Sequence, residues 1–197
     1  MNFLAHLYLS KNNKNILIGN FIADAVKGNK HKNYAKEIQA GILLHREIDY
    51  YTDMHQIVRK SKRRLHERYN HYDGVIIDIL YDHFLAKNWN DYSEIPLDVY
   101  ANSVYSFLQE NKETFPDKIQ HILPYMIEYN WLVAYVSLEG IERILQGMNK
   151  RTKGISKMDL AIEDLKLFYT EFEKDFTSFF KELEKFTEEK TTILLTP

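Results

Sequence analysis

Apolar residues recur at intervals of three and four along most of the chain, a period that is typical of α-helices. Only 7 glycines and 4 prolines interrupt this pattern. It predicts an all-α protein, a single compact helical domain of about seven or eight helices spanning residues 1–197, without a linker or an internal repeat. Helices are expected at residues 2–9, 16–28, 75–89, 97–112, 116–130, 131–148 and 158–190. Residues 34–69 are expected to form one helix, or two with a break near residues 52–55.

Titratable side chains interrupt two of the apolar stripes. Ile42, His45 and Asp49 are spaced by three and four residues, which places them on one side of a helix. The helix at residues 75–89 repeats the pattern with two aspartates and a histidine, at Asp78, Asp82 and His83. Desolvating an unpaired carboxylate costs several kcal/mol, so each of these acids requires an ion pair, hydrogen bonds or a metal.

Two further segments carry polar residues among core-type neighbours. Asn20 and Asp24 lie four residues apart in "ILIGNFIADAVKG", and His6 lies within "NFLAHLYL". Alone, His6 suits a hydrogen-bonded core histidine and Asp24 a helix cap or an ion pair, and His45 with Asp49 also suits a purely structural contact. Together, four converging helices could supply a metal shell, and mixed imidazole and carboxylate ligands favour manganese, iron or zinc over calcium.

Composition narrows the chemistry. The chain has no cysteine, which excludes disulfides, thiolate nucleophiles and cysteine-based metal sites. No apolar run approaches the ~20 residues of a membrane span, and the N-terminal residues do not read as a secretory signal, so we expect a cytoplasmic protein with no membrane partner. A glycine-rich phosphate loop is also missing, which argues against kinases and GTPases.

Charge is nearly balanced overall but locally uneven. The formal net charge of -2 argues against general nucleic-acid binding. One segment, residues 59–68, is nevertheless strongly basic, with Arg59, Lys60, Lys62, Arg63, Arg64 and Arg68. It predicts either a docking face for an acidic partner or an ordinary solvated helix face.

Four motifs resemble one known family. The motifs "MNFLAHLYLS", "GNFIADAVKG", "GILLHREIDYYTD" and "DILYDHFLAKNW" are similar, in order and spacing, to those of the bacterial acyl carrier protein phosphodiesterases, or holo-ACP hydrolases. The sequence similarity is specific over residues 1–89 and looser from there to about residue 151. The final helix resembles the family only in the general character of its residues. It implies a fold related to the HD-type metal-dependent phosphohydrolases.

The resemblance also implies an activity. It is the removal of 4'-phosphopantetheine from a serine of holo-acyl carrier protein, an acidic helical protein, with a divalent cation. The expected cation is manganese, with magnesium, iron and zinc as alternatives. The family's motifs place the metal ligands at Asp24, His45, Asp49, Asp82 and His83. HD-type enzymes carry a His followed by Asp, whereas this chain has the reversed pair Asp82 and His83.

Further roles follow as hypotheses from the same resemblance. Asn2 and His6 match the N-terminal motif, where they would orient a ligand or contact phosphate. For metal-assisted hydrolysis, Asp78 or Asp53 would accept a proton from water, and His6 or His83 would protonate the leaving serine. Arg46 would neutralise phosphate or pair with an acid. The basic residues Arg59, Lys62, Arg63 and Arg64 would steer the acidic carrier protein.

Two other functions remain open from the sequence. An HD-like hydrolase for a nucleotide or another small phosphoester would share the metal site without needing the basic segment. A non-enzymatic helical interaction protein would use the polar stripes as buried ion-pair networks and would bind no metal. The sequence does not predict an oligomeric state.

Overall fold

The all-α prediction is confirmed by a computed structural model, which describes residues 1–196 and contains no strand among them. Its eleven α-helices are joined by short loops and 3₁₀ turns. They are α1 (Phe3–Leu9), α2 (Lys14–Ile22), α3 (Lys36–Met54), α4 (Gln56–Tyr69), α5 (Asp73–Lys87), α6 (Leu97–Glu110), α7 (Asp117–Glu128), α8 (Trp131–Ala134), α9 (Leu138–Arg151), α10 (Ala161–Leu167) and α11 (Tyr169–Leu195). Within the described residues, no helix is both long and apolar enough to cross a membrane.

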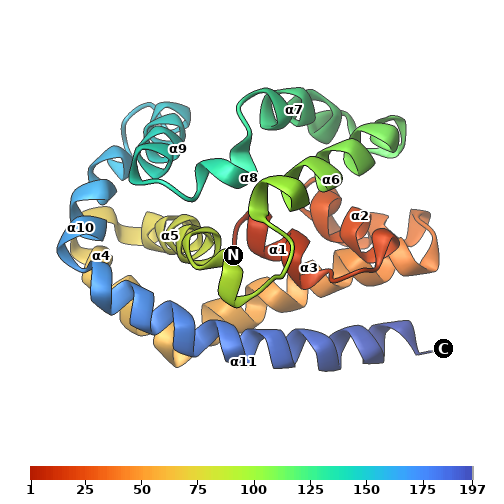
Figure 1. Cartoon of the computed structure of the whole chain (residues 1–197), viewed down its shortest axis with the longest axis horizontal. Helices are drawn as coiled ribbons and strands as arrows, with labels where there is room; N and C mark the ends of the chain where they lie inside the picture. Colours follow the sequence, from red (N-terminus) through yellow and green to blue (C-terminus); the bar gives the residue numbers. More distant parts are fainter. Residues whose placement is uncertain (197) are drawn as a thin grey trace.

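The short helix α1 lies in the middle of the fold, next to α5 (Figure 1). The long helix α11 runs along one side and packs against α3, α4 and α5, while α9 and α10 lie at one end. Four phenylalanines anchor α11 in the core: Phe172, Phe176, Phe179 and Phe180, all fully buried. Each buried aromatic side chain contributes about 1.5–3 kcal/mol through the area it removes from water.

Most helix boundaries agree with the periodicity, and the break near residues 52–55 is confirmed. His55 has extended backbone and caps α4 by accepting a hydrogen bond from the Ile57 N–H. The second predicted helix ends early, because α2 stops at Ile22 and a 3₁₀ turn, η1 (Ala23–Ala25), follows it. Asp24 therefore lies on η1 rather than on a regular helical turn.

Two long helices expected from the pattern are each divided. Instead of one helix at residues 131–148 there are α8 and α9, because Ser137 is extended and its hydroxyl caps α9 at the Gly140 N–H. The last predicted helix is divided at Phe168 into α10 and α11, and a 3₁₀ turn precedes α10. Apolar periodicity continues across both breaks, so it did not reveal them.

Helices α2 and α3 touch through their backbones. A Cβ atom added to Gly19 would lie 2.2 Å from the Ile38 carbonyl oxygen, and one added to Gly41 would lie 2.4 Å from the Ile16 carbonyl oxygen. Only glycine permits so close an approach. Because Gly19 precedes Asn20 and Gly41 lies one turn before His45, this contact brings Asn20 against His45.

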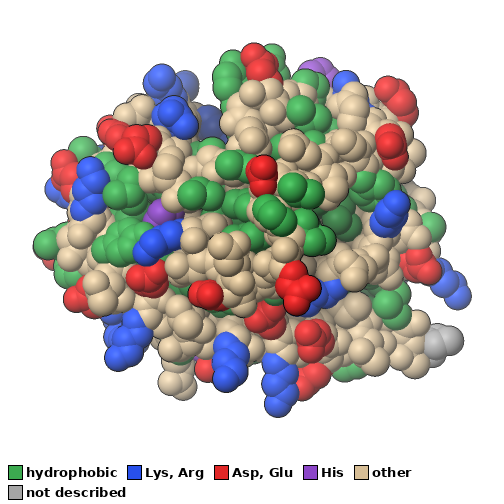
Figure 2. Space-filling model, viewed as in Figure 1, with side chains coloured by type: hydrophobic (Ala, Val, Ile, Leu, Met, Phe, Trp, Pro, Cys, Tyr) green, Lys and Arg blue, Asp and Glu red, His purple; other side chains and the backbone are tan. Residues whose placement is uncertain are grey.

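The exposed surface mixes charges of both signs. On the face shown in Figure 2, acidic and basic side chains are interspersed around the edge, and hydrophobic side chains gather towards the middle, around α8. No single sign of charge dominates this face.

We predict that Gly41→Ala lowers the free energy of unfolding by about 1–3 kcal/mol, because the added methyl group would overlap the backbone of α2. The helices would have to separate, and urea denaturation measures the loss of stability.

Gly147→Ala in α9 is the matched control, because nothing lies within 4 Å of the Cβ it would add. It should raise the stability by about 0.5–1 kcal/mol, the usual gain of alanine over glycine inside a helix. Equal stability changes in the two variants would contradict a tight contact between α2 and α3.

Candidate metal centre

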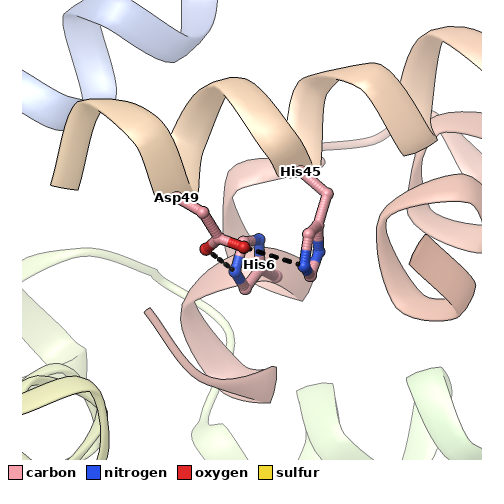
Figure 3. Close-up of side chains that lie close together, drawn as sticks. All are labelled: His6, His45 and Asp49. Carbon is pink, nitrogen blue, oxygen red and sulfur yellow. Dashed lines mark hydrogen bonds and ion pairs between the residues drawn. The ribbon is translucent and has the colours of Figure 1, made fainter. Parts of the chain in front are cut away.

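His6, His45 and Asp49 converge from two helices (Figure 3). His45 and Asp49 lie on successive turns of α3 and point towards His6 on α1. The two Asp49 carboxylate oxygens lie 3.1 Å from His6 Nε2 and 3.2 Å from His45 Nε2. The imidazole rings are stacked, with centroids 3.8 Å apart. Each residue offers a ligand atom within 4.8 Å of the others, a spacing that suits one shared cation.

Asn20 orients both imidazoles. Its side-chain oxygen accepts hydrogen bonds from His6 Nδ1 at 2.9 Å and His45 Nδ1 at 3.1 Å, and its backbone oxygen lies 2.9 Å from His45 Nδ1. The amide is itself oriented, because its nitrogen donates to the His6 carbonyl oxygen at 2.8 Å. Since carbonyl oxygens only accept, both Nδ1 atoms carry hydrogen and both Nε2 atoms face Asp49.

The protonation of this cluster is strongly shifted. Burial lowers the pKa of His6 to about 4, and the neighbouring His45 acts in the same direction. Burial would also lower the pKa of His45, but the carboxylates of Asp24 and Asp49 outweigh it and raise the value to about 9. Burial would raise the pKa of Asp49, yet the two imidazoles hold it well below its usual value.

A divalent cation fits this donor set. With both Nδ1 atoms hydrogen-bonded, the Nε2 lone pair of His6 faces a carboxylate and would be repelled unless positive charge lies between them. A proton on His45 supplies part of that charge, and a metal would supply it to both rings. Two imidazoles and a carboxylate are ligands that manganese, iron and zinc share.

Asp24 joins the cluster from η1. Its carboxylate lies 3.4 Å from His45 Nε2, and its side chain is 69% exposed. A small pocket opens between Asp24, His6 and His45, and Phe3 and Phe21 form its apolar side. Four of the predicted site residues, His6, Asp24, His45 and Asp49, are thus brought together.

The structure differs from the prediction at Asp82. Its buried carboxylate accepts hydrogen bonds from the backbone N–H groups of Asn2, Leu4 and Ala5, at 3.1, 2.8 and 3.4 Å. Burial raises the pKa of Asp82 to about 7, although these N–H groups and the Met1 amino group favour its ionised form. Asp82 therefore fixes the start of α1 instead of adding a donor to the cluster.

His83 also has other partners. Its Nδ1 donates to the Tyr135 carbonyl oxygen at 2.7 Å, and its Nε2 lies 2.8 Å from the Tyr169 hydroxyl. Both ring nitrogens are therefore used between α5, α11 and the segment joining α8 to α9. The predicted metal and proton-transfer roles of His83 do not fit this position.

The two predicted proton acceptors lie outside the cluster. Asp78 accepts a hydrogen bond from the Met1 amino group at 2.9 Å, and this amino group also lies 3.7 Å from an Asp49 oxygen. Asp53 is exposed and pairs with Lys62 at 2.6 Å. Asp78 thus reaches the cluster only through the amino group, and Asp53 faces away towards α4.

Two predicted substrate contacts have structural partners. The Asn2 side chain accepts a hydrogen bond from the Phe3 N–H, which caps α1, while Asn2 also lines the pocket. The Arg46 guanidinium donates to the carbonyl oxygens of Val26 and Gly28 at 2.7 and 3.0 Å. Arg46 therefore ties the segment after Asp24 to α3.

The basic residues of α4 are largely neutralised. Lys60 and Arg64 both pair with the buried Asp175 of α11, at 3.0 and 2.7 Å. Lys62 pairs with Asp53, and Arg68 pairs with Glu163 and Asp164. Among residues 1–196, Arg59 and Arg63 are the cations of this segment that form no ion pair with a carboxylate.

Sequence reasoning noticed Asn20 as a polar position but gave it no role in the site. Its i, i+4 spacing from Asp24 was the only signal. Its contacts with the two histidines depend on the packing of α2 against α3, which spacing along one helix does not encode.

We predict that Asn20→Ala weakens Mn²⁺ binding about 10–100-fold, the usual cost of losing a group that orients metal ligands. All candidate ligands would remain, but the rings would lose their common acceptor. Isothermal titration with Mn²⁺ measures the change, and Asn12→Ala, in the exposed turn before α2, serves as the control. Unchanged affinity in Asn20→Ala would contradict the orienting role.

We also predict that Asp82→Ala lowers the free energy of unfolding by about 2–4 kcal/mol, because it leaves buried backbone N–H groups without acceptors. The folded fraction should bind Mn²⁺ with unchanged affinity. Asp82→Asn retains one acceptor oxygen and should lose less stability. A variant that kept its stability but lost Mn²⁺ would instead identify Asp82 as a ligand.

Comparison with known proteins agrees with the motifs. A family model described as acyl carrier protein phosphodiesterase matches residues 1–183. A protein of that name from Pectobacterium atrosepticum is 34% identical over 146 residues, covering 74% of this chain and 76% of the relative. Those from Photorhabdus laumondii and Yersinia pestis are each 33% identical over 147 residues, covering 74% of this chain and 74% and 76% of the relatives.

No solved structure matches the chain, so the relation to the HD-type fold stays a prediction. The family assignment rests on sequence similarity over most of the chain, and it confirms the resemblance found in the four motifs. The chain belongs to the acyl carrier protein phosphodiesterase family, a family of enzymes.

Proposed function

We propose that this protein is a metal-dependent phosphodiesterase that hydrolyses the 4'-phosphopantetheine group from the serine of holo-acyl carrier protein. The products would be apo-acyl carrier protein and 4'-phosphopantetheine. The family supports the substrate, and the donor cluster supports the dependence on a divalent cation, for which manganese is the first candidate.

The observation that carries this proposal is the pair of Nε2 atoms facing one carboxylate. An ion-pair network that only stabilised the fold would not require two stacked imidazoles whose Nδ1 atoms both donate to the same amide oxygen, that of Asn20. Such an arrangement directs two ring nitrogens and a carboxylate at one point, as a metal ligand set requires, and His45 would release its proton when a cation binds. His6, His45 and Asp49 would hold the cation.

When bound, a divalent cation supplies positive charge that polarises a phosphodiester oxygen and acidifies water. The chain supplies the rest. Asn20 holds both imidazoles in the orientation that directs their Nε2 atoms towards Asp49. Phe3 and Phe21 line the pocket with side chains that form no hydrogen bonds. Asp24, exposed and 3.4 Å from His45 Nε2, is the carboxylate best placed to take a proton from the attacking water.

Proton transfer by the other sequence candidates is less well supported. His83 uses both nitrogens elsewhere, and Asp53 is held by Lys62. Asp78 would first have to release the Met1 amino group. We therefore assign Asp24 the role that the sequence divided between Asp78 and Asp53.

The test is to incubate the purified protein with holo-acyl carrier protein and Mn²⁺ and to weigh the carrier protein by mass spectrometry. Loss of the phosphopantetheine mass is expected with Mn²⁺ and should stop when EDTA is added. His45→Ala should reduce kcat at least about 10³-fold, because the cation would lose a ligand.

Asp98→Asn, an exposed carboxylate change at the start of α6, should retain wild-type activity. Hydrolysis of nucleotides or small phosphoesters without any change in the carrier protein would favour the HD-like alternative. A protein that bound no metal and hydrolysed neither substrate would favour the non-enzymatic alternative.

A further inference from the structure

A lysine-rich segment extends from the residue after Asp24 to the first residue of α3. Residues 25–36, here called the cationic loop, contain no acidic residue and four lysines: Lys27, Lys30, Lys32 and Lys36. All four side chains are exposed, and within residues 1–196 none of them forms an ion pair. This distinguishes the loop from α4, where Lys60, Lys62, Arg64 and Arg68 are paired with acids.

The cationic loop has a fixed shape. Arg46 donates to the carbonyl oxygens of Val26 and Gly28, and Gln39 donates to that of Tyr34 at 2.7 Å. Both ends of the loop are thereby bound to α3, and its middle forms a 3₁₀ turn, η2 (Gly28–Asn33). A loop that is already ordered loses less conformational entropy when a partner binds.

The loop also adjoins the candidate metal centre. It begins directly after Asp24, and Arg46, which binds its backbone, is the residue after His45. Positive charge here lies beside the acids of the candidate metal centre, Asp24 and Asp49, which would repel an anionic substrate. Charge next to a site acts within a Debye length of ~10 Å at 0.1 M salt.

We propose that the cationic loop is the surface on which the acidic protein substrate docks, in place of the basic helix α4. The inference rests on the proposed function, because that function supplies an acidic partner. Four unpaired lysines on an ordered loop would attract an acidic surface and present its modified serine to the adjacent pocket. The paired cations of α4 would attract it less.

The experiment compares two triple variants of equal charge loss. Lys27→Ala, Lys30→Ala and Lys32→Ala together form the loop variant. Lys150→Ala, Arg151→Ala and Lys153→Ala together form the control variant; these exposed residues lie at and just after the end of α9 and form no ion pair among the described residues. In Figure 1, α9 lies on the left and α2, which leads into the loop, lies on the right.

At low salt the loop variant should lose about tenfold or more in kcat/KM for holo-acyl carrier protein, while kcat changes less than about twofold. The control variant should stay within about twofold of wild type. Hydrolysis of bis(4-nitrophenyl) phosphate should be equal in all three proteins. The loop variant should also lose most of the salt dependence that wild type shows.

Binding of apo-acyl carrier protein, measured by calorimetry, separates this inference from the proposed function. If wild type binds the carrier protein but does not cleave it, the proposed function fails, and the same binding comparison still tests the loop. Equal binding and equal kcat/KM in the loop and control variants would overturn the loop proposal alone. Wild type that neither binds nor cleaves the carrier protein would overturn both.

A double variant, Arg59→Ala with Arg63→Ala, tests the competing surface on α4. Its kcat/KM should fall less than that of the loop variant. A larger fall would place docking on α4 and overturn the proposal. Loss of binding to anionic phospholipid vesicles in the loop variant, with unchanged binding of the carrier protein, would overturn it in favour of a membrane surface.

Discussion

The backbone contact between α2 and α3 is the constraint on which the candidate site depends. At Gly19 and Gly41 the two helices approach so closely that no side chain fits between them. This distance sets Asn20 within hydrogen-bonding reach of His45, and the same amide reaches back to His6 on α1. A slightly wider separation would take His45 away from the amide oxygen that also orients His6. Close helix packing here fixes the direction of polar groups as well as burying apolar ones.

The cluster carries an electrostatic conflict that the fold tolerates. His6 and His45 stack face to face, so both rings cannot readily be charged. Burial and the neighbouring His45 lower the pKa of His6 to about 4, whereas the carboxylates of Asp24 and Asp49 raise the pKa of His45 to about 9. One shared proton leaves the second ring neutral towards Asp49. A divalent cation would resolve the conflict for both rings at once. Burying these titratable groups costs folding free energy, and such a cost is typical of ligand-binding sites.

Periodicity could predict the helices and much of the site, because both are local properties of a chain. His45 and Asp49 were visible as polar residues on an apolar stripe of one helix, and the structure keeps them together. Asp82 looked the same in sequence but has a different role. Its partners are backbone N–H groups about eighty positions away, and backbone donors leave no mark in a sequence. The chain therefore indicated which acids were buried, but not what compensated each one.

The sequence also did not reveal which surface charges are paired, as the basic segment at residues 59–68 shows. Six cations within ten residues suggested a docking face, yet a carboxylate more than a hundred residues away, that of Asp175, forms ion pairs with both Lys60 and Arg64. Neighbours along the chain did not reveal that pairing. The cationic loop was less conspicuous because its lysines are spread out.

An anionic partner is attracted most by cations that form no ion pair and that lie close to the site. Asp24, Asp49 and Asp78 place negative charge in and beside the histidine cluster, so an acidic protein would be repelled there in the absence of a cation. The attraction must then come from cations close enough to act and not already paired. Among the described residues, the lysines of the cationic loop meet both conditions, since they follow Asp24 directly. On the proposed function, an acidic substrate would therefore need a separate, positively charged surface beside the acids of the candidate metal centre.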